Sequence, residues 1–192
     1  SSTTSNTYST VDRFQLRTSG VDEEPTQAQA DVASGTTPFT LGFRKAFKIT
    51  NGNQTSGAGA ADRIRIMHTI EAQDIANSGW NYVSTSSYIT LSFWVKSSVA
   101  QNFYGHVRVV DGTSQNYPFE TGSLSADTWT KITKTIAGNS NLQFDNDANK
   151  GLEINIVPFY GTTYTSGVSL NAWSAYGSAA DLTPDQTSTW YT

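Results

Sequence analysis

Four side chains in two neighbouring segments could form a sugar-binding surface. Residues 88–98 alternate apolar and polar side chains, and Trp94 falls on the polar side of that pattern. Tyr104, His106 and Arg108 share one side of a second alternating segment, residues 103–110. If the two strands pair as a hairpin, these four side chains lie close together. An aromatic ring stacks on the C–H face of a sugar while Arg and His bind its hydroxyl groups, so the pattern fits glycan binding.

Packing is the alternative interpretation of the same four residues. A large aromatic side chain on a polar face needs a second layer, a neighbouring subunit or a ligand to cover it. Because most aromatic clusters in proteins are packing contacts, the sequence leaves the two interpretations of Trp94 open.

A second candidate site is the acidic loop around Asp145 and Asp147. With Asn146 and Asn149 it places four oxygen-bearing side chains within five residues, and calcium prefers several such oxygens on a flexible loop. The loop lacks the glycine and terminal glutamate of an EF-hand, and Asp and Asn are also ordinary turn residues. Calcium is therefore the one cofactor that the sequence suggests, and an ordinary turn without a bound ion is the alternative.

Catalytic patterns are missing from the sequence. There is no cysteine, no Gly-x-Ser-x-Gly or His-Glu-x-x-His motif and no glycine-rich phosphate loop. The two histidines are His68, in an otherwise apolar row typical of a core position, and His106. Nothing in the sequence brings two carboxylates together, so we expect a non-enzymatic protein.

The composition indicates a polar but weakly charged surface. Charged residues make up 15% of the 192 residues, the formal net charge is −4 and the pI is about 5.0, which argues against nucleic acid as a partner. Such surfaces are common in extracellular and virion β proteins. No apolar run approaches the ~18 residues of a membrane span. The chain opens without Met, so we expect a piece of a longer protein.

The elements that must position these residues are strands. An antiparallel two-sheet β-sandwich of jelly-roll topology in a single domain, residues 1–192, with at most one short helix within residues 71–81, is the predicted fold. The two-residue turn Asp111-Gly112 between alternating runs predicts a hairpin. Alternating residues predict strands at 11–17, 43–50, 62–71, 88–98, 103–110, 129–136 and 152–159.

These strands resemble, in order and spacing, a carbohydrate-binding-module-like jelly roll found in virion proteins of tailed phages, often marine or cyanobacterial. The hallmark is Ile89-Thr-Leu-Ser-Phe-Trp-Val-Lys-Ser-Ser98. The other matching pieces are Val11-Asp-Arg-Phe14, residues 43–51, Arg65-Ile-Met-His-Thr-Ile-Glu71, Trp129-Thr-Lys-Ile-Thr-Lys-Thr-Ile136, residues 145–156 and Leu170-Asn-Ala-Trp173.

Two features of the sequence depart from the pattern of these phage proteins. His68 stands where they usually have Gln, which points to different packing. They generally end in one more strand, whereas this chain stops at Trp190-Tyr-Thr192. A sandwich that lacks a strand has an open edge to which a strand of another chain can add.

The resemblance implies a virion structural role, as a tail fibre, spike or capsid decoration on the particle surface. We expect other virion proteins and further copies of the chain as partners, with a host-surface glycan as an additional ligand and no nucleic acid or membrane insertion. Because the hallmark includes Trp94, the resemblance favours packing for that residue. The alternative function is a carbohydrate-binding module of a polysaccharide-degrading enzyme.

Overall fold

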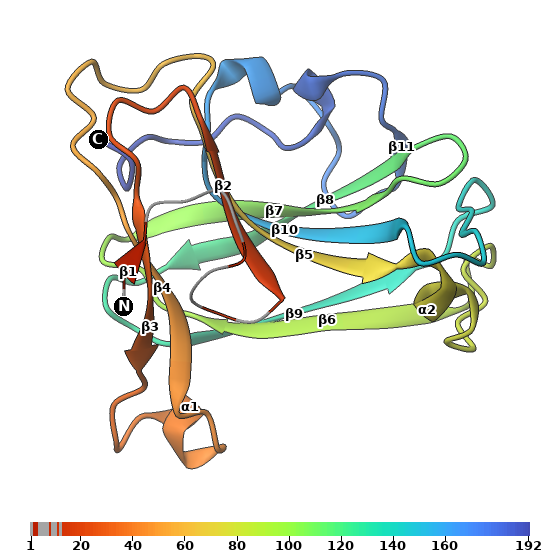
Figure 1. The fold of residues 1–192 in the computed structure, drawn as a ribbon, viewed down its shortest axis with the longest axis horizontal. Coiled ribbons are helices and arrows are strands. Elements are labelled where there is room, and N and C mark those ends of the chain that lie inside the picture. The colour runs from red at the N-terminus through yellow and green to blue at the C-terminus, as the bar shows by residue number, and fades with distance from the viewer. Residues whose placement is uncertain (1, 4–7, 9–10, 12) are drawn as a thin grey trace.

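The computed structural model describes residues 2–3, 8, 11 and 13–192, and its strands form two layers (Figure 1). All pairs of named strands in the described part of the chain are antiparallel. The chain crosses between the layers after β1, β2, β4, β5, β6, β8 and β9, as a jelly-roll sandwich does. The predicted all-β sandwich is confirmed.

One layer is a six-stranded sheet whose inner face carries the core. Its order is β11 (Ser174–Ala175), β8 (Gln115–Leu124), β7 (Gln101–Val109), β10 (Lys150–Tyr160), β5 (Arg63–Glu71) and β2 (Phe14–Ser19). Side chains alternate between the two faces of each strand, so the apolar rows of β7 and β10 point inward and their polar rows point outward.

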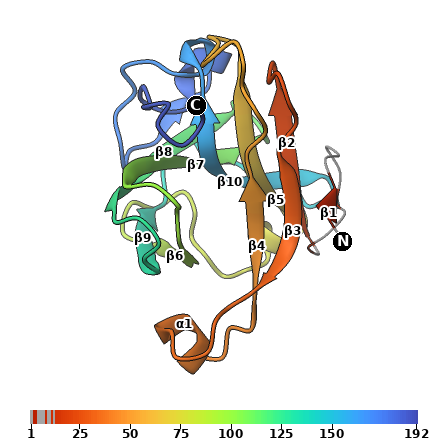
Figure 2. The same cartoon turned by 90° about the vertical axis from the view of Figure 1, so that its left-hand side faces the viewer.

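The second layer is divided into two separate ribbons. One contains β1 (Ser2–Thr3), β3 (Thr26–Asp31) and β4 (Lys45–Thr50), and the other pairs β6 (Tyr88–Val95) with β9 (Thr130–Ala137). In Figure 1, β3 and β4 run steeply across the direction of β6 and β9. Figure 2 shows β6 between β9 and β4, with no strand joining the two ribbons.

Each ribbon packs on its own part of the inner face. Beneath β6 and β9 lies the main core, which includes Val107, Phe119, Ile136 and Leu152. A smaller core under β4 contains Leu16, Ile64, Phe159 and Tyr191, with Phe47 and Ile49 packed against it. The larger sheet is thus covered at both ends by different ribbons.

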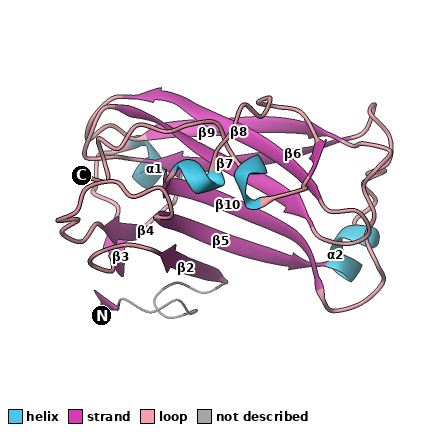
Figure 3. Cartoon of the chain, turned by 90° about the horizontal axis from the view of Figure 1, so that it is seen from above, coloured by secondary structure: helices cyan, strands magenta, loops and turns pink. Residues whose placement is uncertain are grey.

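Helices are short and lie at the margins. The helix expected within residues 71–81 is α2 (Ala72–Ala76), and the structure adds a second short helix, α1 (Thr37–Thr40), where proline occupies the first turn. Two 3₁₀ turns, η1 (Thr162–Tyr164) and η2 (Ala179–Asp181), belong to a C-terminal segment that lies over the outer face of the six-stranded sheet (Figure 3). None of the helices in the described residues is long and apolar enough to cross a membrane.

Seven strands occur where alternation predicts them, with ends shifted by a few residues. β2 begins at Phe14 rather than at Val11, and Asp12 of that expected strand lies outside the described residues. β7 and β8 form the hairpin predicted at Asp111-Gly112. Four strands were not predicted: the two-residue β1 and β11, and the longer β3 and β8, whose sequences lack a continuous apolar row.

Candidate functional site

The structure separates Trp94 from the three residues expected beside it. β6 pairs with β9, where Trp94 lies opposite Lys131, while β7 lies between β8 and β10 in the other layer. The prediction that these two strands pair as a hairpin, on which the four-residue cluster depended, is therefore wrong. The short connection after β6 turns inward at the buried Ser97 and crosses to the opposite sheet instead of folding back beside β6.

Trp94 instead lines an apolar groove between the two ribbons of the second layer. The groove has a volume of about 630 Å³ and is open to solvent. We define the apolar groove by ten lining side chains: Phe47 and Ile49 of β4, Phe93, Trp94 and Val95 of β6, Ile66, Phe103 and Ile156 of the larger sheet, and Trp129 and Trp190. The facing edges of β4 and β6 pair with no other described strand.

Only cations contribute charge to this groove. Lys45, Lys96 and Lys131 line it, and no acidic side chain of the described residues does. Lys45 forms an exposed ion pair with Asp31, whose own position is outside the lining. The ammonium of Lys96 lies 5.7 Å from the ring centroid of Trp129, a cation–π contact at the rim.

Tyr104, His106 and Arg108 do share one face, as their spacing predicts. They project from the outer face of β7, opposite Val157, Asn155 and Glu153 of β10. The C-terminal segment covers much of this row, because Asn116 of the neighbouring strand donates to the carbonyls of Asp181 (2.8 Å) and Leu182 (3.0 Å).

His106 is a buried structural histidine. It is 0% exposed, and its Nδ1 lies 2.9 Å from Asn116 Oδ1. Because the Asn116 amide nitrogen faces two carbonyls, its oxygen faces His106, so Nδ1 carries the proton. Nε2 then accepts from the Tyr160 hydroxyl at 3.2 Å. Burial, and next the positive charge of Arg65, lower the pKa of His106 to about 3.

The surroundings of Tyr160, Tyr104 and Arg108 also differ from those of an open sugar site. Burial raises the pKa of Tyr160 to about 12, and burial followed by the charge of Glu120 raises the pKa of Tyr104. The Arg108 guanidinium stacks 3.9 Å from the ring centroid of Tyr176 and donates weakly to Ser114 (3.4 Å). Tyr104 and Arg108 are half-buried, so both keep some exposed surface.

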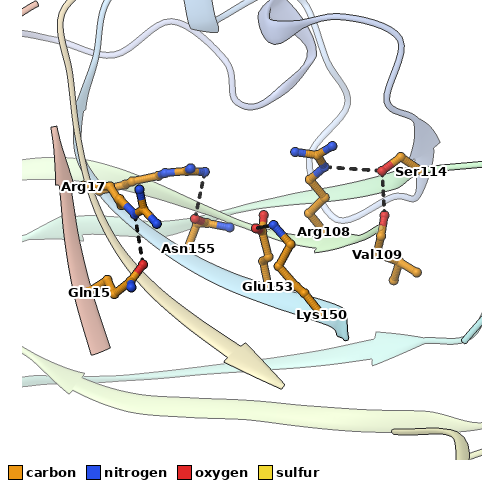
Figure 4. A network of polar contacts seen from close by, with 9 residues as sticks. Gln15, Arg17, Arg108, Val109, Ser114, Lys150, Glu153 and Asn155 are labelled. Atoms are coloured by element: carbon orange, nitrogen blue, oxygen red, sulfur yellow. Dashed lines mark hydrogen bonds and ion pairs between the residues drawn. The ribbon is translucent and has the colours of Figure 1, made fainter. Parts of the chain in front are cut away.

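The same outer face carries a row of cations, of which the sequence analysis singled out Arg108 alone. We define the cationic strip as Arg17 of β2, Arg65 of β5, Lys150 at the start of β10 and Arg108 of β7. Figure 4 labels Arg17, Lys150 and Arg108 among the polar side chains that they contact. Its members are far apart in sequence, and only the strand order β2–β5–β10–β7 brings them together. Alternation alone could have assigned each to its face, but not to its neighbours.

The acidic loop forms hydrogen bonds to the first turn of α2. The backbone carbonyls of Asp147 and Asn149 accept from the first amides of that helix, at Gln73 and Ala72, both at 2.9 Å. Asp147 also accepts from the Asn149 amide at 3.0 Å, and Asp145 accepts from Gln143 at 3.2 Å. Nowhere in the described residues do three His, Cys, Asp or Glu side chains gather to hold a metal ion. Calcium at Asp145 and Asp147 thus gains no support from the geometry.

No family model, curated protein or solved structure matches this chain. The fold places it in the class of all-β antiparallel sandwich proteins.

Proposed function

We propose that the chain is a non-enzymatic structural module of a phage virion, a tail fibre, spike or capsid decoration, which joins neighbouring polypeptides through the apolar groove. The groove is the observation that carries the proposal. Large solvent-open apolar surfaces on monomeric proteins mark interaction sites, and this one lies between two strand edges that pair with no other strand in the described part of the chain. The resemblance of the strand motifs to phage virion jelly rolls supports the setting.

The occupant that fits this groove is an extended strand. The free edge of β6 offers backbone N–H and C=O groups for β-augmentation, in which main-chain hydrogen bonds give affinity. Alternate side chains of such a strand would point into the groove, toward Ile66, Phe103 and Ile156. The outward side chains would lie near Lys96 and Lys131, so carboxylates are favoured there.

Cross-linking mass spectrometry of purified virus particles tests this function. A carbodiimide joins amines to carboxylates that lie in contact, so Lys96 and Lys131 should be linked to acidic residues of a neighbouring polypeptide. Lys48 is the internal control, because it is exposed on β4 but does not line the groove. Absence of the chain from particles, or links at Lys48 alone, would contradict the proposal.

A carbohydrate-binding module of a polysaccharide-degrading enzyme is the second candidate. The partly exposed Tyr104 and Arg108 on the outer face favour it, because a sugar can reach both from solvent. This candidate predicts that the complete natural protein is a monomer with a linked hydrolase or lyase region. Size-exclusion chromatography with light scattering distinguishes it from a multi-copy virion module.

A further inference from the structure

We infer that the cationic strip binds an acidic polysaccharide, one that carries carboxylate or sulfate groups along its length. This goes beyond the proposed assembly role, and it uses the face of the molecule opposite to the apolar groove. The groove lies between the ribbons of the second layer, whereas the strip lies on the outer face of the six-stranded sheet. Either activity can therefore be present without the other.

The first observation is an uncompensated pair of like charges. Arg17 and Arg65 are directly opposite each other on β2 and β5, an arrangement that is unfavourable unless an anion lies between or above them. Within the described part of the chain, neither makes an ion pair. Arg17 donates to Gln15 Oε1 at 2.9 Å, and Arg65 donates to Asn155 Oδ1 at 3.2 Å. Both partners are neutral amides, so the two positive charges stay available to a ligand.

The second observation is a surplus of hydrogen-bond donors. Asn155 is 0% exposed, yet its Nδ2 has no hydrogen-bond partner among the described residues, and the same is true of Arg65 Nε. Buried donors without acceptors are uncommon and costly. An anionic group over Arg17 and Arg65 would draw the Arg65 guanidinium toward it and would provide the acceptors that this part of the face lacks.

Two carboxylates lie beside the strip: Glu71 is opposite Lys150 on β5, and Glu153 forms an ion pair with the same lysine. Glu153 is 2% exposed, and its Oε1 contacts the Lys150 ammonium at 2.6 Å, while its Oε2 has no partner in the described structure. Lys150 itself keeps 45% of its side chain exposed. Three arginines and one lysine therefore lie beside two acids, which leaves the strip positively charged on a chain with a net charge of −4.

The length of the strip indicates a polymer rather than a single anion. From β2 to β7 the strip crosses three inter-strand steps, which is about 14 Å at the usual strand spacing. A linear polyanion can place successive charges on Arg17, Arg65 and Arg108. Single-stranded nucleic acid is disfavoured because it needs open aromatic platforms. The nearby rings of Tyr164 and Tyr176 already carry the guanidinium groups of Arg63 and Arg108.

Affinity electrophoresis of the whole chain tests the strip. The gels contain polygalacturonate as the carboxylate probe, dextran sulfate as the sulfate probe, and neutral dextran or single-stranded DNA as comparisons. We expect retention by at least one acidic polysaccharide, none by dextran, and weaker retention by DNA. Which of the two acidic probes retains the chain identifies the anionic group, and rising salt should abolish the effect.

Arg17→Gln and Arg65→Gln should each weaken retention by about tenfold, while Lys48→Gln, which removes a charge elsewhere, should not. Because Arg17 lies on the edge strand, Arg17→Gln should leave the melting temperature unchanged or raise it by relieving the like-charge pair. That variant carries the test if Arg65→Gln does not fold. Equal retention of Arg17→Gln and the unmodified chain, retention by neutral dextran, or tighter binding of DNA would overturn the inference.

Discussion

His106 makes the stability of this protein depend on pH. Its pKa is about 3 in the folded state and about 6.5 in an unfolded chain, so in between only the unfolded state binds the proton. The His106 contribution to the free energy of unfolding is therefore fully present above pH 6.5 and is lost as the pH falls toward 3. The slope from this one group is up to ~1.4 kcal/mol per pH unit. Urea unfolding between pH 7 and pH 4 measures the slope.

The variant His106→Gln isolates the histidine from the carboxylates that also titrate in acid. Gln keeps a donor toward Asn116 but does not titrate, so the variant should be less stable at pH 7 and should lose less stability on acidification. Parallel pH profiles for the two proteins would show that His106 is not the buried neutral group described here.

Gly105 is a second residue with a sharp structural requirement. A Cβ at this position would lie 2.4 Å from the Phe119 ring and 2.7 Å from the Asn155 carbonyl oxygen. Gly105→Ala should therefore destabilise the fold by ~1–3 kcal/mol or more through overpacking. Gly167→Ala is the matched control, since nothing lies within 4 Å of its added Cβ. Thermal unfolding of both variants gives the comparison, and equal melting temperatures would contradict the packing between β7 and β8.

At the scale of elements, alternation predicts the faces of strands but not their neighbours. The inward row of β6, Ile89, Leu91 and Phe93, packs on the main core as its spacing predicts. Tyr104, His106 and Arg108 share a face for the same reason. Partner choice depends on layer crossings, which leave no local signal in the sequence, so Trp94 could not be assigned to the correct sheet.

The two longer unpredicted strands, β3 and β8, lack the alternating pattern from which the others were predicted. β3 alternates Gln with Ala and Thr, and its inward residue Gln27 is 0% exposed despite being polar. β8 contains Pro118, which usually argues against a strand between two neighbours. Here the short β11 pairs only with Gln115 and Asn116, so the missing N–H of Pro118 leaves no ladder bond broken on that side.

The cationic strip was also beyond prediction at this scale. Arg17 and Arg65 are separated by many residues and become neighbours only through the pairing of β2 with β5. Each arginine alone is an ordinary solvent-facing strand residue. The proximity of the two arginines exists only in the assembled sheet, and so does the position beside them of Asn155 Nδ2, which has no hydrogen-bond partner among the described residues.

At the scale of the whole molecule, two different surfaces lie on opposite sides of one sheet. The apolar groove is closed on one side by β4 and on the other by β6, and the charged side chains that line it are all lysines among the residues that the structure describes. The outer face is polar and cationic. A particle-bound module can thus be anchored through the groove while it presents the strip to solvent.

Hydrogen–deuterium exchange can detect an extended strand in the apolar groove, because main-chain pairing protects the backbone amides of the β6 edge. The probe is a nine-residue peptide that alternates valine or phenylalanine with threonine or glutamate. The control is the same peptide with alternate backbone nitrogens methylated, which blocks main-chain pairing. We expect the probe, and not its methylated form, to slow exchange in residues 92–96, at the end of β6 and directly after it, with β2 and β5 unchanged. Unchanged exchange in residues 92–96 at saturating peptide, or equal protection by both peptides, would contradict it.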